Sequence, residues 1–182
     1  MSKCKETIVA YLEFIAYNIE KKGQPKGDSA GATIYGITKK YYPSEFGRIA
    51  RAIEQGNEYE TVMEIYLGLF KKCNAGSLAF PLNIQYFDYW FHKPKLAGMS
   101  LQTVINEMIC EEGQSITVDG IVGKKTIEAY NYVASYIPIQ KLHRLFVLDR
   151  IHTYMNTGSS FEKGWVNRVI RLERFILTKD IK

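Results

Sequence analysis

The first clear pattern in the chain is a stripe of apolar positions near the N-terminus. Between Thr7 and Glu20, apolar side chains recur every three or four residues, at Ile8, Leu12, Ile15, Ala16 and Ile19. This spacing places them on one face of an amphipathic helix. Gly23 and Pro25 stop such a helix, so we expect Glu20 in or just past its last turn.

A short β element is predicted after this helix. Residues 21–31 contain several Gly and Lys residues and indicate a loop. Residues 32–38 contain Thr, Ile and Tyr and favour a short strand or a hairpin. This is the only β structure that the pattern predicts.

The remainder of the chain predicts helices separated by turns. A Gly/Ser/Pro-containing hinge at 74–81 is the best boundary between two lobes, 1–78 and 79–182. The predicted helices start at Pro43, cover 59–73 and 84–91, run from a cap at Ser100 to Cys110, cover 124–136, run from Pro138 to Tyr154, and run from a capping box at Ser159 to Leu177. The fold class is therefore mainly α, with a little β (α+β).

Composition narrows the class of protein. The chain has 182 residues, of which 46% are hydrophobic and 24% charged, as in ordinary globular proteins. The net charge of +5 favours a polyanionic partner, such as nucleic acid, an anionic membrane or a cell-wall polymer, without choosing among them. Cys4, Cys73 and Cys110 form no CxxC pair, so we expect no disulfide framework, metal site or cofactor.

Two features bear on location. No apolar run approaches the length of a membrane span, so we expect no membrane insertion. Residues 1–6 lack the apolar region of a classical signal peptide. If its substrate lies outside the cytoplasm, a protein without a classical signal peptide needs another route across the membrane, such as release through a holin or a dedicated secretion path.

Two carboxylates flank the turn between the first helix and the β element. Hydrolysis of a glycosidic bond uses one acid to protonate the leaving oxygen and a second carboxylate at the other side. Glu20 suits the acid role, because a helix C-terminus and apolar neighbours both raise the pKa of a carboxyl group, although Lys21 and Lys22 act in the opposite direction. Glu13, one heptad earlier, is the rival acid, and Asp28 is the second carboxylate.

Four motifs, in order along nearly the whole chain, resemble the glycoside hydrolase family 108 muramidases. They are Asp28-Ser-Ala-Gly31-Ala-Thr33-Ile-Tyr35-Gly36-Ile37-Thr38, the pairs Phe87-Asp88 and Leu101-Gln102, Val118-Asp119-Gly120-Ile-Val-Gly123-Lys-Lys-Thr126, and Gly164-Trp165-Val-Asn167-Arg168. The chain departs from the family at Lys21-Lys22, where two Gly residues are usual, at Ala30, and at His92-Lys93-Pro94.

The resemblance implies a lysozyme-like fold with a catalytic lobe at 1–78 and a helical peptidoglycan-binding-like lobe at 79–182, packed as one compact unit. It implies a monomer that cleaves the β-1,4 bond between N-acetylmuramic acid and N-acetylglucosamine and contacts the glycan strand and stem peptide. Glu20 would be the general acid, Asp28 would orient water or stabilise positive charge, and Thr33 would hold the water.

Four further residues are candidates for substrate binding. Tyr35 can stack on a sugar ring, and Gly36 allows the backbone to approach a sugar closely. Asp88 and His92 lie in the second lobe, where the resemblance places a peptidoglycan-binding region. For each of these residues, packing or turn formation is the competing interpretation.

Three other functions remain open from the sequence. A lytic transglycosylase needs the same acid but uses a hydroxyl of the muramic acid as nucleophile. A non-catalytic wall-binding or secretion accessory protein is favoured by the Lys21-Lys22 departure. A nucleic-acid binder is suggested only by the charge and by Lys39-Lys40-Tyr41-Tyr42, without any recognition motif, so we expect no nucleic-acid partner.

Overall fold

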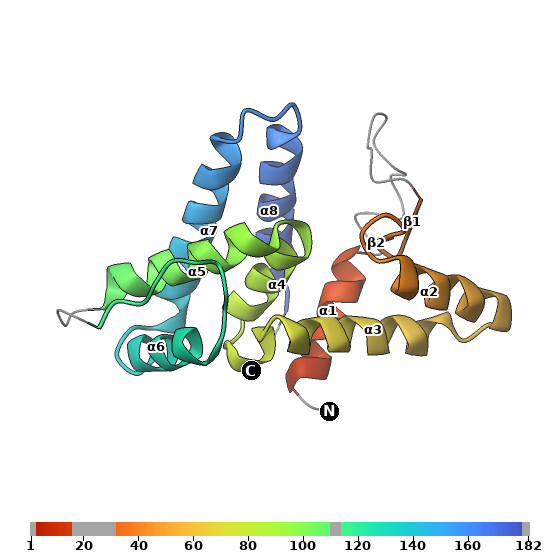
Figure 1. Cartoon of the computed structure of the whole chain (residues 1–182), viewed down its shortest axis with the longest axis horizontal. Helices are drawn as coiled ribbons and strands as arrows, with labels where there is room; N and C mark the ends of the chain where they lie inside the picture. Colours follow the sequence, from red (N-terminus) through yellow and green to blue (C-terminus); the bar gives the residue numbers. More distant parts are fainter. Residues whose placement is uncertain (1–2, 16–31, 110–113, 180–182) are drawn as a thin grey trace. The chain divides into compact units, whose positions relative to one another are not determined.

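The computed structural model describes residues 3–15, 32–109 and 114–179 (Figure 1). These residues form eight α-helices, one short 3-10 helix and one antiparallel hairpin. The predicted class is confirmed: the fold is mainly α, with a lysozyme-like order of N-terminal helix, hairpin and helical bundle. Within these ranges, no helix has both the length and the apolar character that a membrane span requires.

The chain divides into two compact units, Met1–Leu69 and Phe70–Lys182. The boundary expected from the sequence, between residues 78 and 79, lies nine residues further along the chain than this division. Packing of the two lobes into one compact unit stays a prediction.

The first unit contains α1, the hairpin and two further helices. They are α1 (Lys3–Ile15), β1 (Thr33–Ile34), β2 (Ile37–Thr38), α2 (Pro43–Gln55) and α3 (Glu58–Lys72), whose last turn belongs to the second unit. The apolar stripe of α1 is buried at Ile8 and Ile15, as the spacing predicts. Tyr11 of α1 packs its ring against Tyr66 of α3, with 5.8 Å between centroids.

Helix α2 has clear start and stop signals. It begins at Pro43, as predicted, because the ring of proline fixes a helical φ where no N–H partner is needed. It ends at Gly56, whose φ of 70° allows its N–H to bond to the carbonyls of Ala52 and Ile53. The helix packs against the hairpin.

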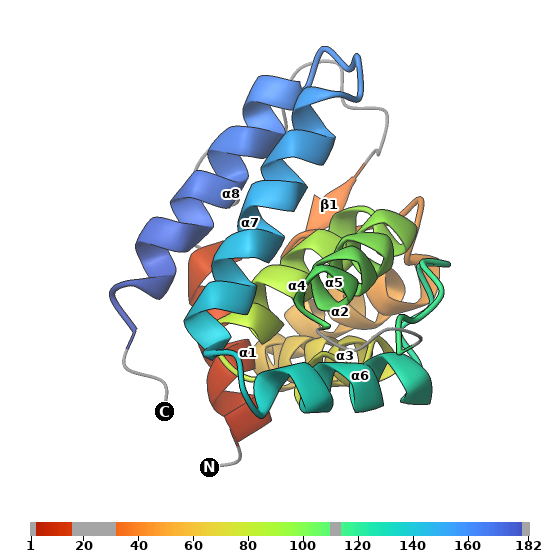
Figure 2. The ribbon, with the colours of Figure 1, turned by 90° about the vertical axis from the view of Figure 1, so that its left-hand side faces the viewer.

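The second unit is a bundle of five helices after the 3-10 turn η2 (Ala75–Ser77). They are α4 (Leu82–His92), α5 (Pro94–Met108), α6 (Lys124–Ala134), α7 (Ile139–Met155) and α8 (Glu162–Ile176). Helices α4, α5 and α7 pack against one another, α8 lies along α7, and α6 contacts α5 (Figure 2). The aromatic helix predicted at 84–91 is α4, and it is buried from Leu82 to Tyr89.

Residues 70–73, at the start of the second unit, contact α4. The Phe70 and Phe87 rings meet edge to face at 5.1 Å, and the Tyr86 hydroxyl donates to the Cys73 carbonyl at 3.1 Å. Cys73 is buried, and burial raises the pKa of its thiol to about 12. Cys73 therefore packs as a small hydrophobic residue.

The predicted start of α5 at Ser100 is wrong. The helix begins at Pro94, which occupies its first turn, and Ser100 lies in its buried interior. The Ser100 hydroxyl donates to the carboxylate of Asp149 on α7 instead of capping a helix. The stronger start signal was the proline.

Only the Glu162 half of the capping box predicted before α8 forms. The Glu162 carboxylate accepts a hydrogen bond from the Ser159 N–H at 3.1 Å, and the Ser159 hydroxyl oxygen accepts one from the Phe161 N–H at 3.2 Å. The Glu162 N–H bonds to the Ser159 carbonyl at 3.1 Å instead of to the Ser159 hydroxyl, and α8 begins at Glu162.

Helix α5 approaches the loop before α6 at a contact between two glycines. A Cβ added to Gly98 would lie 2.1 Å from the carbonyl oxygen of Gly120. Gly120 itself has a φ of 82°, and a Cβ there would lie 2.7 Å from the carbonyl oxygen of Lys95. The loop therefore reaches α5 only because both residues lack side chains.

This contact makes a prediction for stability. We expect Gly98→Ala to lower the free energy of unfolding by about 3 kcal/mol, because the methyl group must displace backbone atoms. Gly164→Ala in α8 is the matched control, since no atom lies within 4 Å of an added Cβ there. Urea denaturation of both variants tests this. A Gly98→Ala protein as stable as the control would contradict the tight contact.

Candidate functional site

The hairpin carries three of the candidate residues, Thr33 in its first strand and Tyr35 and Gly36 in its two-residue turn. Thr33 pairs with Thr38 and Ile34 with Ile37, which leaves Tyr35 and Gly36 at the tip. Their φ values of 48° and 77° are both positive, as a type I′ turn requires. A tyrosine is rare in this conformation, and a hydrogen bond from the Tyr66 hydroxyl to the Tyr35 carbonyl at 2.7 Å holds it.

The hairpin tip packs within the first unit. A Cβ on Gly36 would lie 3.1 Å from the Tyr66 hydroxyl oxygen and 3.5 Å from the Ile15 side chain. Thr33 and Tyr35 are half-buried in this unit. The structure thus brings Thr33, Tyr35 and Gly36 together near the end of α1 and the middle of α3.

The two predicted carboxylates, Glu20 and Asp28, lie outside the described residues, as does Gly31. The rival acid, Glu13, is an exposed residue of α1. The catalytic roles of Glu20, Asp28 and Thr33 therefore stay predictions.

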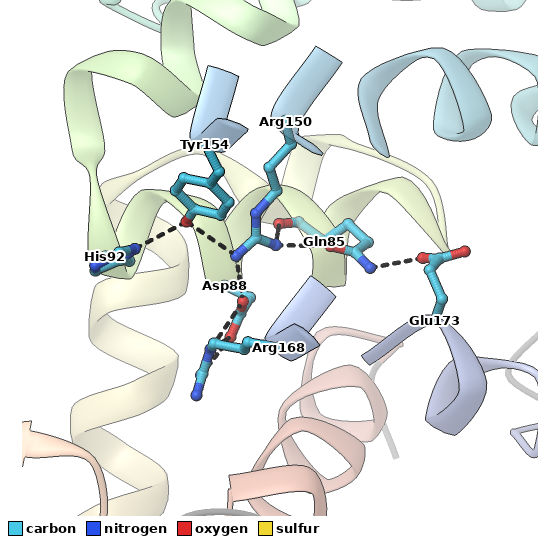
Figure 3. Close-up of polar contacts among 7 residues, drawn as sticks. All are labelled: Gln85, Asp88, His92, Arg150, Tyr154, Arg168 and Glu173. Carbon is cyan, nitrogen blue, oxygen red and sulfur yellow. Dashed lines mark hydrogen bonds and ion pairs between the residues drawn. The ribbon is translucent and has the colours of Figure 1, made fainter. Parts of the chain in front are cut away.

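Asp88 lies at the centre of a buried ion cluster that joins three helices (Figure 3). Its side chain, on α4, is fully buried. One carboxylate oxygen lies 2.6 Å from Arg150 on α7, and the other lies 2.5 Å from Arg168 on α8. Burial alone would raise the pKa of Asp88, but the two guanidinium groups outweigh it and hold that pKa well below its usual range.

Arg150 is itself fully buried, and its other contacts compensate for the loss of water. Its Nη1 donates to the side-chain oxygen of Gln85 at 2.7 Å. Gln85 in turn donates to the carboxylate of Glu173 at 2.6 Å, which brings a second negative group to the cluster (Figure 3). The guanidinium also lies over the rings of Tyr89 and Tyr154, 4.8 and 5.4 Å from their centroids.

His92 extends the same cluster toward the end of α4. Its Nδ1 lies 2.8 Å from the Tyr154 hydroxyl, and its ring meets Trp165 edge to face at 5.0 Å. Burial lowers the pKa of His92 to about 4, assisted by the positive charges of Lys93, Arg168 and Arg150 against the opposing effect of Asp88. The imidazole is therefore neutral at pH 7.

These contacts give Asp88 and His92 a role in holding α4, α7 and α8 together. A buried carboxylate with both oxygens paired to guanidinium groups is a structural centre, since any ligand would have to displace an arginine. The substrate contacts predicted for Asp88 and His92 stay predictions.

A third arrangement lies along α5, where side chains four residues apart hold the segment 114–123. Asn106 makes two bonds to one residue: its amide donates to the Ile116 carbonyl at 2.8 Å and accepts from the Ile116 N–H at 2.9 Å. One turn earlier, the buried Gln102 accepts from the Gly120 N–H at 2.7 Å and donates to Asp119 at 2.8 Å. Gly98, one further turn back, meets Gly120 directly.

A cavity of about 420 Å³ lies beside this segment. Its polar wall includes Gln102 and Thr126, and its rim includes the exposed Ile121. A second cavity of about 360 Å³ adjoins it, and both are lined by Ile116 and Lys125. No group of His, Cys, Asp and Glu among the described residues is arranged to hold a metal ion.

Residues 100–170 match a family model described as "Predicted Peptidoglycan domain". This match supports a peptidoglycan-related protein that associates with the cell wall. The matched range includes Gln102, Asn106, the segment 114–123 and both arginines of the ion cluster. Neither a search of curated proteins nor a search of solved structures gave a significant match.

The sequence interpretation missed Arg150 altogether. Arginine is mostly exposed in proteins, and nothing near position 150 marks this one as buried. The available signal was its partner, Asp88, an acid placed within an aromatic helix that must be buried and therefore needs a cation. Arg168 was noted for its motif but not as the second cation.

Breaking the ion cluster should destabilise the second unit strongly. We expect Asp88→Asn to lower the free energy of unfolding by roughly 3–5 kcal/mol, because it leaves two guanidinium groups without their common counter-charge. Glu128→Gln is the control, since it removes only the exposed pair with Lys124 and should cost less than about 1 kcal/mol. Equal denaturation midpoints for the two variants would show that the cluster contributes little.

The neutral, half-buried His92 predicts loss of stability in acid. The unfolded state binds the His92 proton below about pH 6.5, whereas the folded state binds it only below about pH 4, so protons favour unfolding between these values. We expect the free energy of unfolding to fall by up to about 3 kcal/mol across this window.

Urea titrations at several pH values measure this slope. His92→Gln should flatten it, whatever its effect on stability at pH 7, whereas His152→Gln should not, because His152 is exposed. An unchanged slope in His92→Gln would assign the acid sensitivity to another group.

Proposed function

We propose that this chain is a peptidoglycan hydrolase, an N-acetylmuramidase that cleaves the β-1,4 bond between N-acetylmuramic acid and N-acetylglucosamine. The observation that carries the proposal is the match of residues 100–170 to a peptidoglycan domain. The lysozyme-like order of α1 and hairpin in the first unit supports a catalytic role for that unit.

In the proposed reaction, Glu20 protonates the leaving oxygen. Its sequence position, at the end of an amphipathic stripe, favours the protonated form of the carboxyl group that a general acid requires. Asp28 orients the attacking water or stabilises positive charge at the anomeric carbon, and Thr33 holds that water. The Tyr35 ring and the Gly36 backbone contact the sugar.

A lytic transglycosylase would use the same acid, with a hydroxyl of the muramic acid in place of water. A non-catalytic wall-binding or accessory role is favoured by one observation, the Lys21-Lys22 pair where the resembled family has two glycines. In each case the site of action is the periplasm or the cell wall, after release through a holin or a secretion path.

A peptidoglycan zymogram of single variants tests the acid. We expect Glu20→Gln to lose activity by about 100-fold or more, because an amide cannot donate the proton to the leaving oxygen. Asp28→Asn should also lose activity. Glu13→Gln is the matched control, since it is an exposed glutamate of the same predicted helix and should keep activity.

Circular dichroism of each variant separates loss of chemistry from loss of fold. Full activity in Glu20→Gln would exclude it as the acid, and an inactive wild type that still binds cell walls would favour the accessory role. Analysis of the products separates the two reactions, because a hydrolase leaves reducing ends whereas a transglycosylase leaves 1,6-anhydro ends.

A further inference from the structure

The segment 114–118 is held to α5 in a way that leaves one side of its backbone open. The side-chain amide of Asn106 forms hydrogen bonds with both the N–H and the carbonyl of Ile116. In a trans peptide the carbonyl of one residue and the N–H of the next point in opposite directions. The Ser115 carbonyl and the Thr117 N–H must therefore point away from Asn106.

These two groups are available for a ligand. Ser115 and Thr117 are exposed and line the larger cavity. Across the described ranges, no hydrogen bond uses the Ser115 carbonyl or the Thr117 N–H. An acceptor and a donor on either side of one residue are the pair that an added β-strand engages.

The surrounding side chains define the chemistry of such a strand. Ile121 is 72% exposed and Val118 is 38% exposed, which gives the edge an apolar rim suited to small aliphatic side chains. Lys125 lines both cavities and takes part in no ion pair of the described residues.

Two acidic groups that line these cavities already have partners. Asp119 accepts hydrogen bonds from Gln102 and from the Ile121 N–H, and Glu128 lies 3.7 Å from Lys124. Lys125 has no such partner among the described residues, so its amine is the group on this surface that can pair with a carboxylate of a ligand.

We propose that residues 115–117 and Lys125 bind the stem peptide of peptidoglycan by β-strand addition. The inference rests on the proposed function, of which it names the ligand contacts. A stem peptide offers backbone N–H and carbonyl groups, small aliphatic side chains and free carboxylates. A glycan strand offers hydroxyl and acetamido groups without that backbone alternation, so the open edge of 115–117 selects the peptide.

The test is binding of the full chain to a disaccharide–tetrapeptide muropeptide, measured by calorimetry beside the same disaccharide without its peptide. The muropeptide has no bond from muramic acid to a following glucosamine, so a muramidase does not consume it. We expect the wild type to bind the muropeptide at least about tenfold more tightly than the bare disaccharide.

Two pairs of variants locate the contacts. Thr117→Pro removes the N–H and should weaken muropeptide binding by about five- to tenfold, whereas Thr117→Ala keeps the N–H and should bind as the wild type does. Lys125→Met should weaken binding several-fold and reduce its dependence on salt, whereas Lys124→Met, on a lysine already paired with Glu128, should do neither.

The failures of the two proposals are distinguishable. Equal affinity of the wild type for the muropeptide and the bare disaccharide overturns the stem-peptide site, as does unchanged binding in Lys125→Met. Retention of the wild type on purified sacculi shows that wall binding survives such a result. A wild type that is inactive in the zymogram would instead remove the proposed muramidase activity itself.

Discussion

The bundle of the second unit depends on a single carboxylate between two guanidinium groups. Asp88 and Arg150 are fully buried, and each would be costly to bury without the other. Because Arg168 brings a second positive charge, Asp88 and the two arginines together carry one excess positive charge. Gln85 accepts a hydrogen bond from Arg150 and donates one to the carboxylate of Glu173, which connects that negative charge to the cluster. The arrangement links α4, α7 and α8 by ion pairs in addition to their apolar packing.

This frame positions the surface along α5. The helix packs against both α4 and α7, so its outward face is presented by a rigid element. On that face Gly98, Gln102 and Asn106 lie one turn apart and hold an irregular segment by backbone contacts. The loop is thereby held in place without a neighbouring strand, and it lies within the range 100–170 that matches a peptidoglycan domain.

Local signals in the sequence were sufficient for most elements but not for the contacts between them. The stripe of α1, Pro43 and the aromatic run of α4 each act within a few residues, and they predicted helices that the structure contains. The partners of Asp88 lie 62 and 80 residues away, where no periodicity connects them. Likewise, Gly98 reads as a weak helix residue until Gly120 is seen against it.

The candidate site shows the same difference between local signals and distant contacts. Residues 32–38 were predicted as a short strand or a hairpin because of their residue types, and the structure has a hairpin there with Tyr35 and Gly36 at its turn. The Tyr66 hydroxyl that holds the turn lies 31 residues later and has no local signature. A contact between residues so far apart in the sequence cannot be predicted from local patterns, and it is seen only in the folded structure.

The reactivity of the Cys73 thiol can report local opening of the second unit. Thiol reagents attack the thiolate, and a buried thiol with a pKa near 12 supplies almost none of it at neutral pH. In a protein whose Cys4 and Cys110 have been replaced, the rate of Cys73 modification would therefore report how often the contact between residues 70–73 and α4 opens. For as long as that contact holds, this thiol takes no part in disulfide exchange, whatever the redox state of its surroundings.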